Sequence, residues 1–382
     1  MEAAQCFKSF FDFFCHHRII QEAETDPFKQ NSKRHKLFIV KSVLILVACI
    51  LLGIYGKSFE DAFIPNRSCI NRMINWVCLG AMLMTCFIVA WETMVASRED
   101  VKIWNTFETI ENALRLCNQN PDETLRKYQR VYKIIFFTYF ALLCLIGAIL
   151  VIEFKDMDGP LVDFIVIFEL LSIVDVNRVL QIVMYVRILT CYIHHLKEAV
   201  RNAVLSVSMG NDPDGPNLEP IQTQLRKSSA CYFLCIKAFR LIQDQFAWGL
   251  FVVCLKFSII LWNEIYWTVY RAIMETSYEL YCLNVVPYHF VYFSFTWSCE
   301  CLTAEITWLS QLLYELDLNK ASTYIKMRIT QLMLLLEYKV FFFHTFGVCR
   351  VSYHLIVQYA ISGATKVSFI AQLMIDFYNE MK

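Results

Sequence analysis

The chain has 382 residues and no net charge, because 35 Lys and Arg residues balance 35 Asp and Glu residues. Hydrophobic residues make up 57% of the sequence and charged residues only 18%, below the roughly 25% that is usual in soluble domains. This composition is typical of an integral membrane protein. The balanced charge argues against a nucleic-acid partner, which would require a basic surface.

Seven apolar stretches are long enough to cross a bilayer as helices, which takes about 20 residues each. They predict an all-α membrane protein with spans at 37–56, 73–96, 131–153, 161–189, 246–267, 285–306 and 340–375. The last stretch is too long for one straight span, so we expect it to split in two near Gly347, Arg350 or Gly363. The first span must also target the chain, because residues 1–36 carry no secretory signal.

The distribution of basic residues predicts the orientation. With the N-terminus inside, the cytosolic segments hold 22 Lys and Arg residues and the outer segments hold 6, which makes residues 1–36 cytoplasmic and the tail 376–382 extracellular. Asn66, in the triplet Asn-Arg-Ser, is then a candidate glycosylation site in the first outer loop. The inner segments 97–130 and 190–245 are long and helical in pattern, so we expect the helices to extend into a cytosolic anchor region.

Cysteine and histidine residues give few candidate sites. Of the 16 cysteines, only Cys69 and Cys282 fall outside on this map, where they could form a disulfide; the ordinary role of the others is that of a small apolar side chain. His194 and His195 stand at a cytosolic helix end with no carboxylate motif beside them. We therefore expect no metal site and no cofactor.

Aromatic and polar side chains gather in the outer halves of spans four to six, as in a mostly apolar small-molecule site. The candidate ligand-binding residues are Glu169, Trp262, Tyr266, Tyr288, His289 and Tyr292. Trp and Tyr also form ordinary interfacial belts, so the belt interpretation stays open. Glu169 would suit a basic ligand through charge pairing, although a sugar would also use carboxylates and stacking rings. Asp175 and Arg178, three residues apart, are expected to form a structural ion pair.

The end of the chain carries the residues of a family signature. The stretch "LLEYKVFFFHTFGVCRVSYHLIVQYAISGATKVSFIAQL" resembles the C-terminal signature of insect gustatory receptors, in which a helix ends in Thr-Tyr, five mostly apolar residues and Gln-Phe. Thr365 and Gln372 keep the spacing, whereas Lys366 stands at the Tyr position and Leu373 at the Phe position. The resemblance implies a tetrameric, ligand-gated, poorly selective cation channel. It also implies a pore lined by the seventh span, a ligand bound among spans two to six, and a place in the plasma membrane of sensory dendrites.

A polar stripe follows the same helix. Residues spaced three and four apart share one helix face, and here they are Ser362, Thr365, Phe369, Gln372 and Asp376. In a tetramer this stripe would line the pore, with Phe369 or Leu373 closing it and Asp376 concentrating cations at the outer mouth. The alternative is a helix contact made by interhelical hydrogen bonds. Lys366 lies beside the stripe, and we expect it to pair with a carboxylate or to point between subunits.

Other functions fit less well. A G-protein-coupled receptor requires the opposite orientation, and its Asp-Arg-Tyr and Asn-Pro-x-x-Tyr motifs are not found in this sequence. A secondary transporter would show an internal repeat, which we do not find. No catalytic motif indicates an enzyme. An olfactory-type or gustatory-receptor-like subunit that needs a co-receptor stays possible, so the tetramer could be homomeric or heteromeric. Membrane lipid and a small tastant, preferably bitter or otherwise aversive, are the expected partners.

Overall fold

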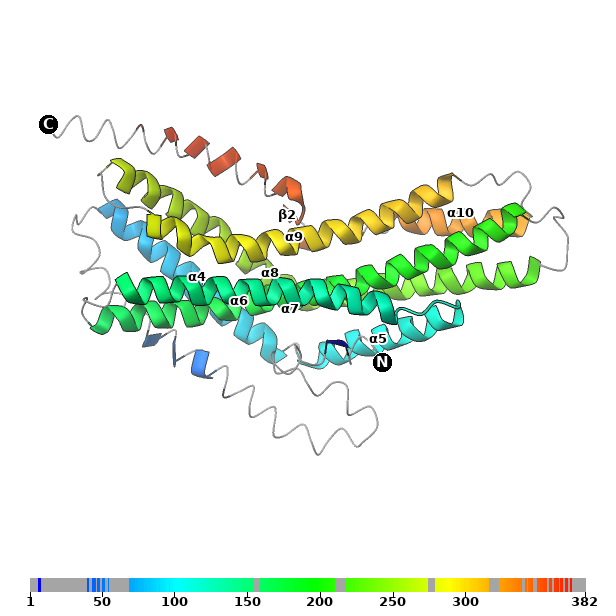
Figure 1. Ribbon diagram of the computed structural model, residues 1–382, viewed down its shortest axis with the longest axis horizontal. Helices are drawn as coiled ribbons and strands as arrows, with labels where there is room; N and C mark the ends of the chain where they lie inside the picture. Colours follow the sequence, from blue (N-terminus) through cyan, green and yellow to red (C-terminus); the bar gives the residue numbers. More distant parts are fainter. Residues whose placement is uncertain are drawn as a thin grey trace.

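The computed structural model is almost entirely helical (Figure 1), which confirms the predicted fold class. It describes residues 6–7, isolated positions from 40 to 54, residues 69–95, 97–153, 159–209, 218–273, 279–315 and 323–338, and most positions from 341 to 372. The helices are α4 (Cys69–Val95), α5 (Ser97–Leu116), α6 (Asp122–Glu153), α7 (Gly159–Met209), α8 (Leu218–Ile273), α9 (Glu279–Tyr314) and α10 (Thr323–Tyr338).

The predicted spans two to six lie in α4, α6, α7, α8 and α9, in that order. Within the described residues, three helical segments are long and apolar enough to cross a membrane: Asp122–Ile149, Leu171–Ala203 and Ile221–Tyr266. Trp76–Glu92 in α4 is a shorter apolar segment. The total of seven spans and the orientation of the termini stay predictions.

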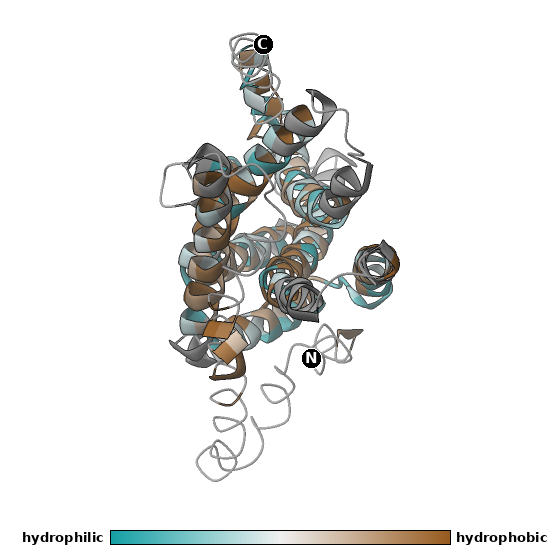
Figure 2. Cartoon of the chain, turned by 90° about the vertical axis from the view of Figure 1, so that its left-hand side faces the viewer, coloured by the Kyte–Doolittle hydropathy of each residue, from teal (hydrophilic) through white to brown (hydrophobic). Residues whose placement is uncertain are grey.

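Helix α7 forms the centre of the bundle. It packs against α4, α6, α8 and α9, and 94% of its most apolar window is buried, compared with 28% for α6. Helix α6 instead exposes large hydrophobic side chains along one face: Ile134, Phe137, Leu145 and Ile152. The view along the bundle shows hydrophobic residues on outward-facing parts of several helices (Figure 2). Such outward apolar faces are expected where the solvent is lipid.

The helices extend well beyond the predicted spans, as the patterns at 97–130 and 190–245 indicate. Helix α5 is amphipathic, and its buried residues Ile103, Trp104, Phe107, Ile110 and Leu114 recur at helical spacing. This face packs on α8 and α7. The long helices α7 and α8 therefore run together from the apolar spans into a second packed layer, which Figure 1 shows at the right-hand end of the molecule.

The described residues between 341 and 352, in the first half of the predicted span 340–375, are not helical. Two short strands, β1 (His344–Thr345) and β2 (Cys349–Arg350), pair antiparallel with His344 opposite Arg350. Phe341 and Phe343, just before β1, are buried against Phe239 of α8, with ring centroids 4.9 and 4.8 Å from that ring. Aromatic packing therefore overrides the apolar pattern, and the described helical positions resume at Tyr353.

Candidate ligand site and pore segment

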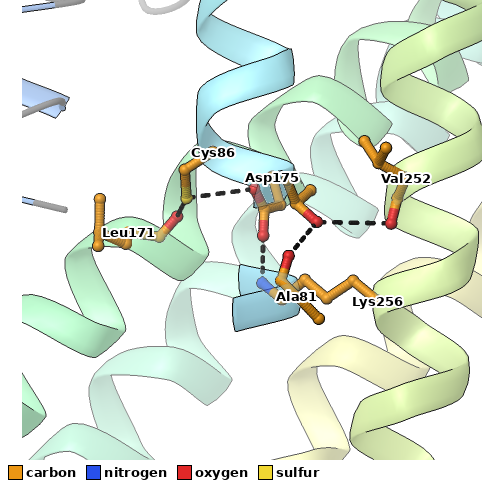
Figure 3. Close-up of polar contacts among 7 residues, drawn as sticks. Ala81, Cys86, Leu171, Asp175, Val252 and Lys256 are labelled. Atoms are coloured by element: carbon orange, nitrogen blue, oxygen red, sulfur yellow. Dashed lines mark hydrogen bonds and ion pairs between the residues drawn. The ribbon is translucent and has the colours of Figure 1, made fainter. Parts of the chain in front are cut away.

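A buried ion pair joins two helices near the middle of the predicted spans. The ammonium of Lys256 in α8 contacts the Asp175 carboxylate in α7, and both side chains are 5% exposed. Figure 3 shows Cys86 of α4 beside them, with its thiol 3.7 Å from Asp175 Oδ1 and 3.6 Å from the Leu171 carbonyl oxygen. The pair therefore lies where α4, α7 and α8 meet.

A second buried ion pair lies nearby. Arg178 of α7 donates to Glu92 Oε2 of α4 at 2.7 and 3.1 Å, and its Cζ lies 4.0 Å from the centre of the Phe246 ring. The other Glu92 oxygen accepts a 3.0 Å hydrogen bond from the backbone N–H of Gly249 in α8. A Cβ on Gly249 would lie 2.4 Å from Glu92 Oε2, so any other residue there would displace the Glu92 carboxylate that binds Arg178.

The predicted ion pair between Asp175 and Arg178 is wrong. Each residue binds a partner on another helix, Asp175 with Lys256 and Arg178 with Glu92. The spacing of Asp175 and Arg178 favours a pair on the same helix. In the structure both side chains are buried against α4 and α8, and the opposite charges on those helices compensate them. The signal that could have found Glu92 and Lys256 is their position inside apolar spans, where ionisable residues are rare.

Three of the six predicted ligand residues come together on α9. Tyr292 stacks on Phe257 of α8 with ring centroids 4.1 Å apart, and His289 meets the same ring edge-on at 5.1 Å. Tyr288 lies one turn before Tyr292 on α9, with its ring centre 5.9 Å from the Lys256 ammonium. This aromatic group borders the Asp175–Lys256 pair and is the candidate wall of a small-molecule site.

The other candidates are placed differently. Tyr266 is buried, and Trp262 is 39% exposed and turns toward the C-terminal segment instead of α9. The side chain of Glu169 lies outside the described part of the structure, as do Asn66 and the side chains of Cys69 and Cys282. The glycosylation site and the disulfide therefore stay predictions.

The C-terminal segment, from Tyr353 onward, presents its polar stripe away from its own subunit. Thr365, Phe369 and Gln372 are exposed and Ser362 is half-buried, and the Thr365 hydroxyl donates back to the Ile361 carbonyl at 2.9 Å. Leu373 and Asp376 lie outside the described residues. Figure 1 shows the segment running beside the outer end of α8 toward the C-terminus.

Lys366 does not have the expected carboxylate partner among the described residues. Its ammonium lies over the Trp262 ring of α8, 3.1 Å from the ring centre. Three residues earlier, a Cβ added to Gly363 would lie 3.0 Å from Ile265 Cδ1, so the Gly363 backbone lies close to the Ile265 side chain. Trp262 and Ile265 thus hold the C-terminal segment against α8, on the side of that segment away from Gln372 and Phe369.

Polar contacts also join the helices beyond the spans. His194 Nδ1 and Lys197 Nζ of α7 lie 3.2 and 2.6 Å from the two Glu305 oxygens of α9. At the end of α9, Glu337 of α10 accepts a hydrogen bond from the Tyr314 hydroxyl, which raises the pKa of Tyr314. The histidine predicted to stand at a helix end is therefore part of an interhelical contact.

The chain matches the 7tm chemosensory receptor family over residues 12–375. It belongs to this family. Among solved structures, the chemosensory receptor resembles the insect olfactory receptor OR5 from Machilis hrabei, with a TM-score of 0.62, 10% sequence identity, and coverage of 86% of this chain and 88% of that one. OR5 in complex with eugenol gives a TM-score of 0.61 and 11% identity over 91% and 93% of the two chains. No curated protein sequence matches this receptor.

The family match confirms the predicted membership of the chemoreceptor superfamily. The gustatory type that the C-terminal signature indicates stays a prediction. At 10 to 11% identity, the likeness to OR5 shows that this receptor shares its helical fold.

Proposed function

We propose that this receptor is a tetrameric, ligand-gated, non-selective cation channel of the gustatory type, opened by a small tastant. The observation that carries the proposal is the exposed polar stripe of Thr365 and Gln372 on an otherwise apolar C-terminal segment. Within a membrane, such groups need water or another protein surface. Four copies around an axis would supply both, with Phe369 as a hydrophobic constriction.

The contacts of α8 supply a route from ligand to pore. On the bundle side, α8 binds α4 through the Gly249 amide and α7 through Lys256. At its outer end it holds the C-terminal segment through Trp262. A ligand that shifts α8 relative to α4 and α7 would therefore shift the pore segment as well, because one rigid helix makes both sets of contacts.

Recording from the full-length chain, delivered to the plasma membrane of a cell line with the N-terminus inside, tests the proposal. The panel of alkaloids, sugars and dissolved carbon dioxide addresses the ligand, and bitter or other aversive compounds are expected to act. Gln372→Glu should raise the permeability of Ca²⁺ relative to Na⁺ several-fold, because a ring of carboxylates attracts divalent cations, and Gln372→Leu should lower it.

Glu123→Gln, at an exposed position on α6, serves as the control and should leave the permeability ratio unchanged. Wild-type permeability ratios in both Gln372 variants would show that the stripe is a helix contact and not part of a pore.

A subunit that needs a co-receptor is the second candidate. Lys366 replaces the tyrosine of the gustatory signature, and the solved relatives are olfactory receptors, both of which favour it. The observation expected in that case is a surface-delivered chain that is silent alone and conducts on co-expression with a second chemoreceptor. The structure of OR5 in complex with eugenol supports a small molecule as ligand in either case.

A further inference from the structure

Two neighbouring side chains near the outer end of α8 carry buried acceptors without a donor. Glu264 Oε2 and Asn263 Oδ1 are shielded from solvent and have no hydrogen-bond partner in the described part of the chain. Three other buried carboxylates described there are satisfied: Glu92 by Arg178, Asp175 by Lys256, and Glu111 by the Tyr192 hydroxyl at 2.8 Å. Asp122 Oδ1, in the first turn of α6, also has no described partner, but it lies outside the predicted spans. Among the described carboxylates inside the predicted spans, Glu264 is therefore the exception.

Two basic side chains of the described spans, Arg178 and Lys256, each already bind one carboxylate, so neither is free to pair with Glu264. Lys366 binds Trp262, and a residue two positions along a helix points about 200° away. Glu264 thus lies on the opposite side of α8 from the C-terminal segment.

That opposite side faces α4. The Cys78 thiol of α4 lies within electrostatic range of both Lys256 and Glu264, and Lys256 marks the junction of α4, α7 and α8. The two free acceptors therefore lie outward of the Asp175–Lys256 pair, on the side of α8 where the candidate ligand site begins. An uncompensated carboxylate in such a place requires a donor, and preferably a positive one.

We propose that Glu264, assisted by Asn263, is the anchor for the protonated amine of a small organic ligand. The proposal deepens the function proposed above and rests on it. An ammonium group supplies both the missing charge and enough N–H donors for two acceptors. Binding there would act on the α4–α8 contact while Trp262, two residues away, contacts the pore segment on the other side of the helix.

The test uses matched pairs of probes on the full-length receptor, each an arylalkyl amine with its neutral alcohol: 2-phenylethylamine with 2-phenylethanol, and 3-phenylpropylamine with 3-phenylpropanol. The readout is the ratio of the half-maximal concentrations of alcohol and amine for evoked current. Loss of a charge-assisted hydrogen bond predicts that Glu264→Gln lowers this ratio about tenfold or more. Glu264→Asp, which keeps the charge, should lower it less, and Glu123→Gln should not change it.

Each outcome decides the question. An unchanged ratio in Glu264→Gln, or a wild-type receptor that responds to the alcohols and not to the amines, overturns the amine anchor and leaves the channel proposal standing. Absence of current from surface-delivered protein with every probe and tastant, alone and with a co-receptor, overturns the channel proposal itself. Thermal unfolding of purified wild-type and Glu264→Gln protein separates misfolding from lost binding. Added amine should raise the unfolding midpoint of the wild type and leave that of the variant unchanged. An equal rise in both proteins refutes the anchor.

Discussion

Replacing Trp262 with leucine removes the ring that lies under the Lys366 ammonium. The position keeps an apolar side chain, but one without an aromatic face. The ammonium is 3.1 Å from the ring centre, and Lys366 is half-buried. Cation–π contacts contribute about 0.5 to 1 kcal/mol at exposed sites and about 2 kcal/mol when desolvated, so we assign this one about 1 to 2 kcal/mol. That free energy corresponds to a factor of about 5 to 30 in the equilibrium between the docked and released C-terminal segment.

A double-mutant cycle measures this coupling. Trp262→Leu and Lys366→Met should each shift the half-maximal ligand concentration by about 5- to 30-fold in the same direction, because both remove one contact. The double variant should show no larger shift than either single one. Trp262→Phe and Lys366→Arg should lie between these variants and the wild type, since each keeps a ring or a cation.

Trp91→Leu on α4 is the matched control, because Trp91 is an exposed tryptophan, 59% accessible, on a different helix. Additive shifts in the double variant would refute the coupling: the two residues would then act independently, and α8 would not hold the pore segment through this contact.

Two further changes test the two buried ion pairs, Glu92 with Arg178 and Asp175 with Lys256. Gly249→Ala should lower surface delivery and the unfolding temperature in detergent, because its Cβ would lie 2.4 Å from Glu92 Oε2; Gly80→Ala, where a Cβ meets nothing within 4 Å, is the control and should not. Asp175→Asn should destabilise the protein by about 3 to 5 kcal/mol, since it leaves the Lys256 ammonium buried and unpaired, and adding Lys256→Met should recover most of that loss. Equal unfolding temperatures for the Asp175→Asn single and double variants would contradict the pairing.

Elements with a long and clear periodicity could be predicted from the sequence. The α5 segment places Ile103, Phe107, Ile110 and Leu114 on one face, and this face is buried as the pattern indicates. The apolar stretches of α4, α6, α7, α8 and α9 could be predicted equally well, because about 20 apolar residues in a row are typical of a helix that crosses a membrane.

The interhelical contacts could not be predicted in the same way. Asp175 and Arg178 fit a same-helix pair by spacing, and only the arrangement of α4 and α8 shows that each has a different partner. The apolar run through Phe341 and Phe343 is predicted as part of a span. In the structure the two rings pack against Phe239, and the chain forms a short antiparallel pair after them. Such outcomes depend on tertiary packing, to which a single sequence gives no direct access.

The partner of Lys366 shows why the candidate pore could be predicted only in part. Spacing alone placed Thr365, Phe369 and Gln372 on one face, and it led us to expect that Lys366, beside this face, pairs with a carboxylate or points between subunits. Four ammonium groups on a narrow axis would repel cations, so a conducting pore requires Lys366 to be turned away from it. The contact with Trp262 meets this requirement within one subunit. It also makes the charge of Lys366 part of the joint between α8 and the C-terminal segment, so that a substitution meant to test selectivity at this position also alters gating. Relative permeability measured at saturating ligand separates the two effects, because it is independent of how often the channel opens.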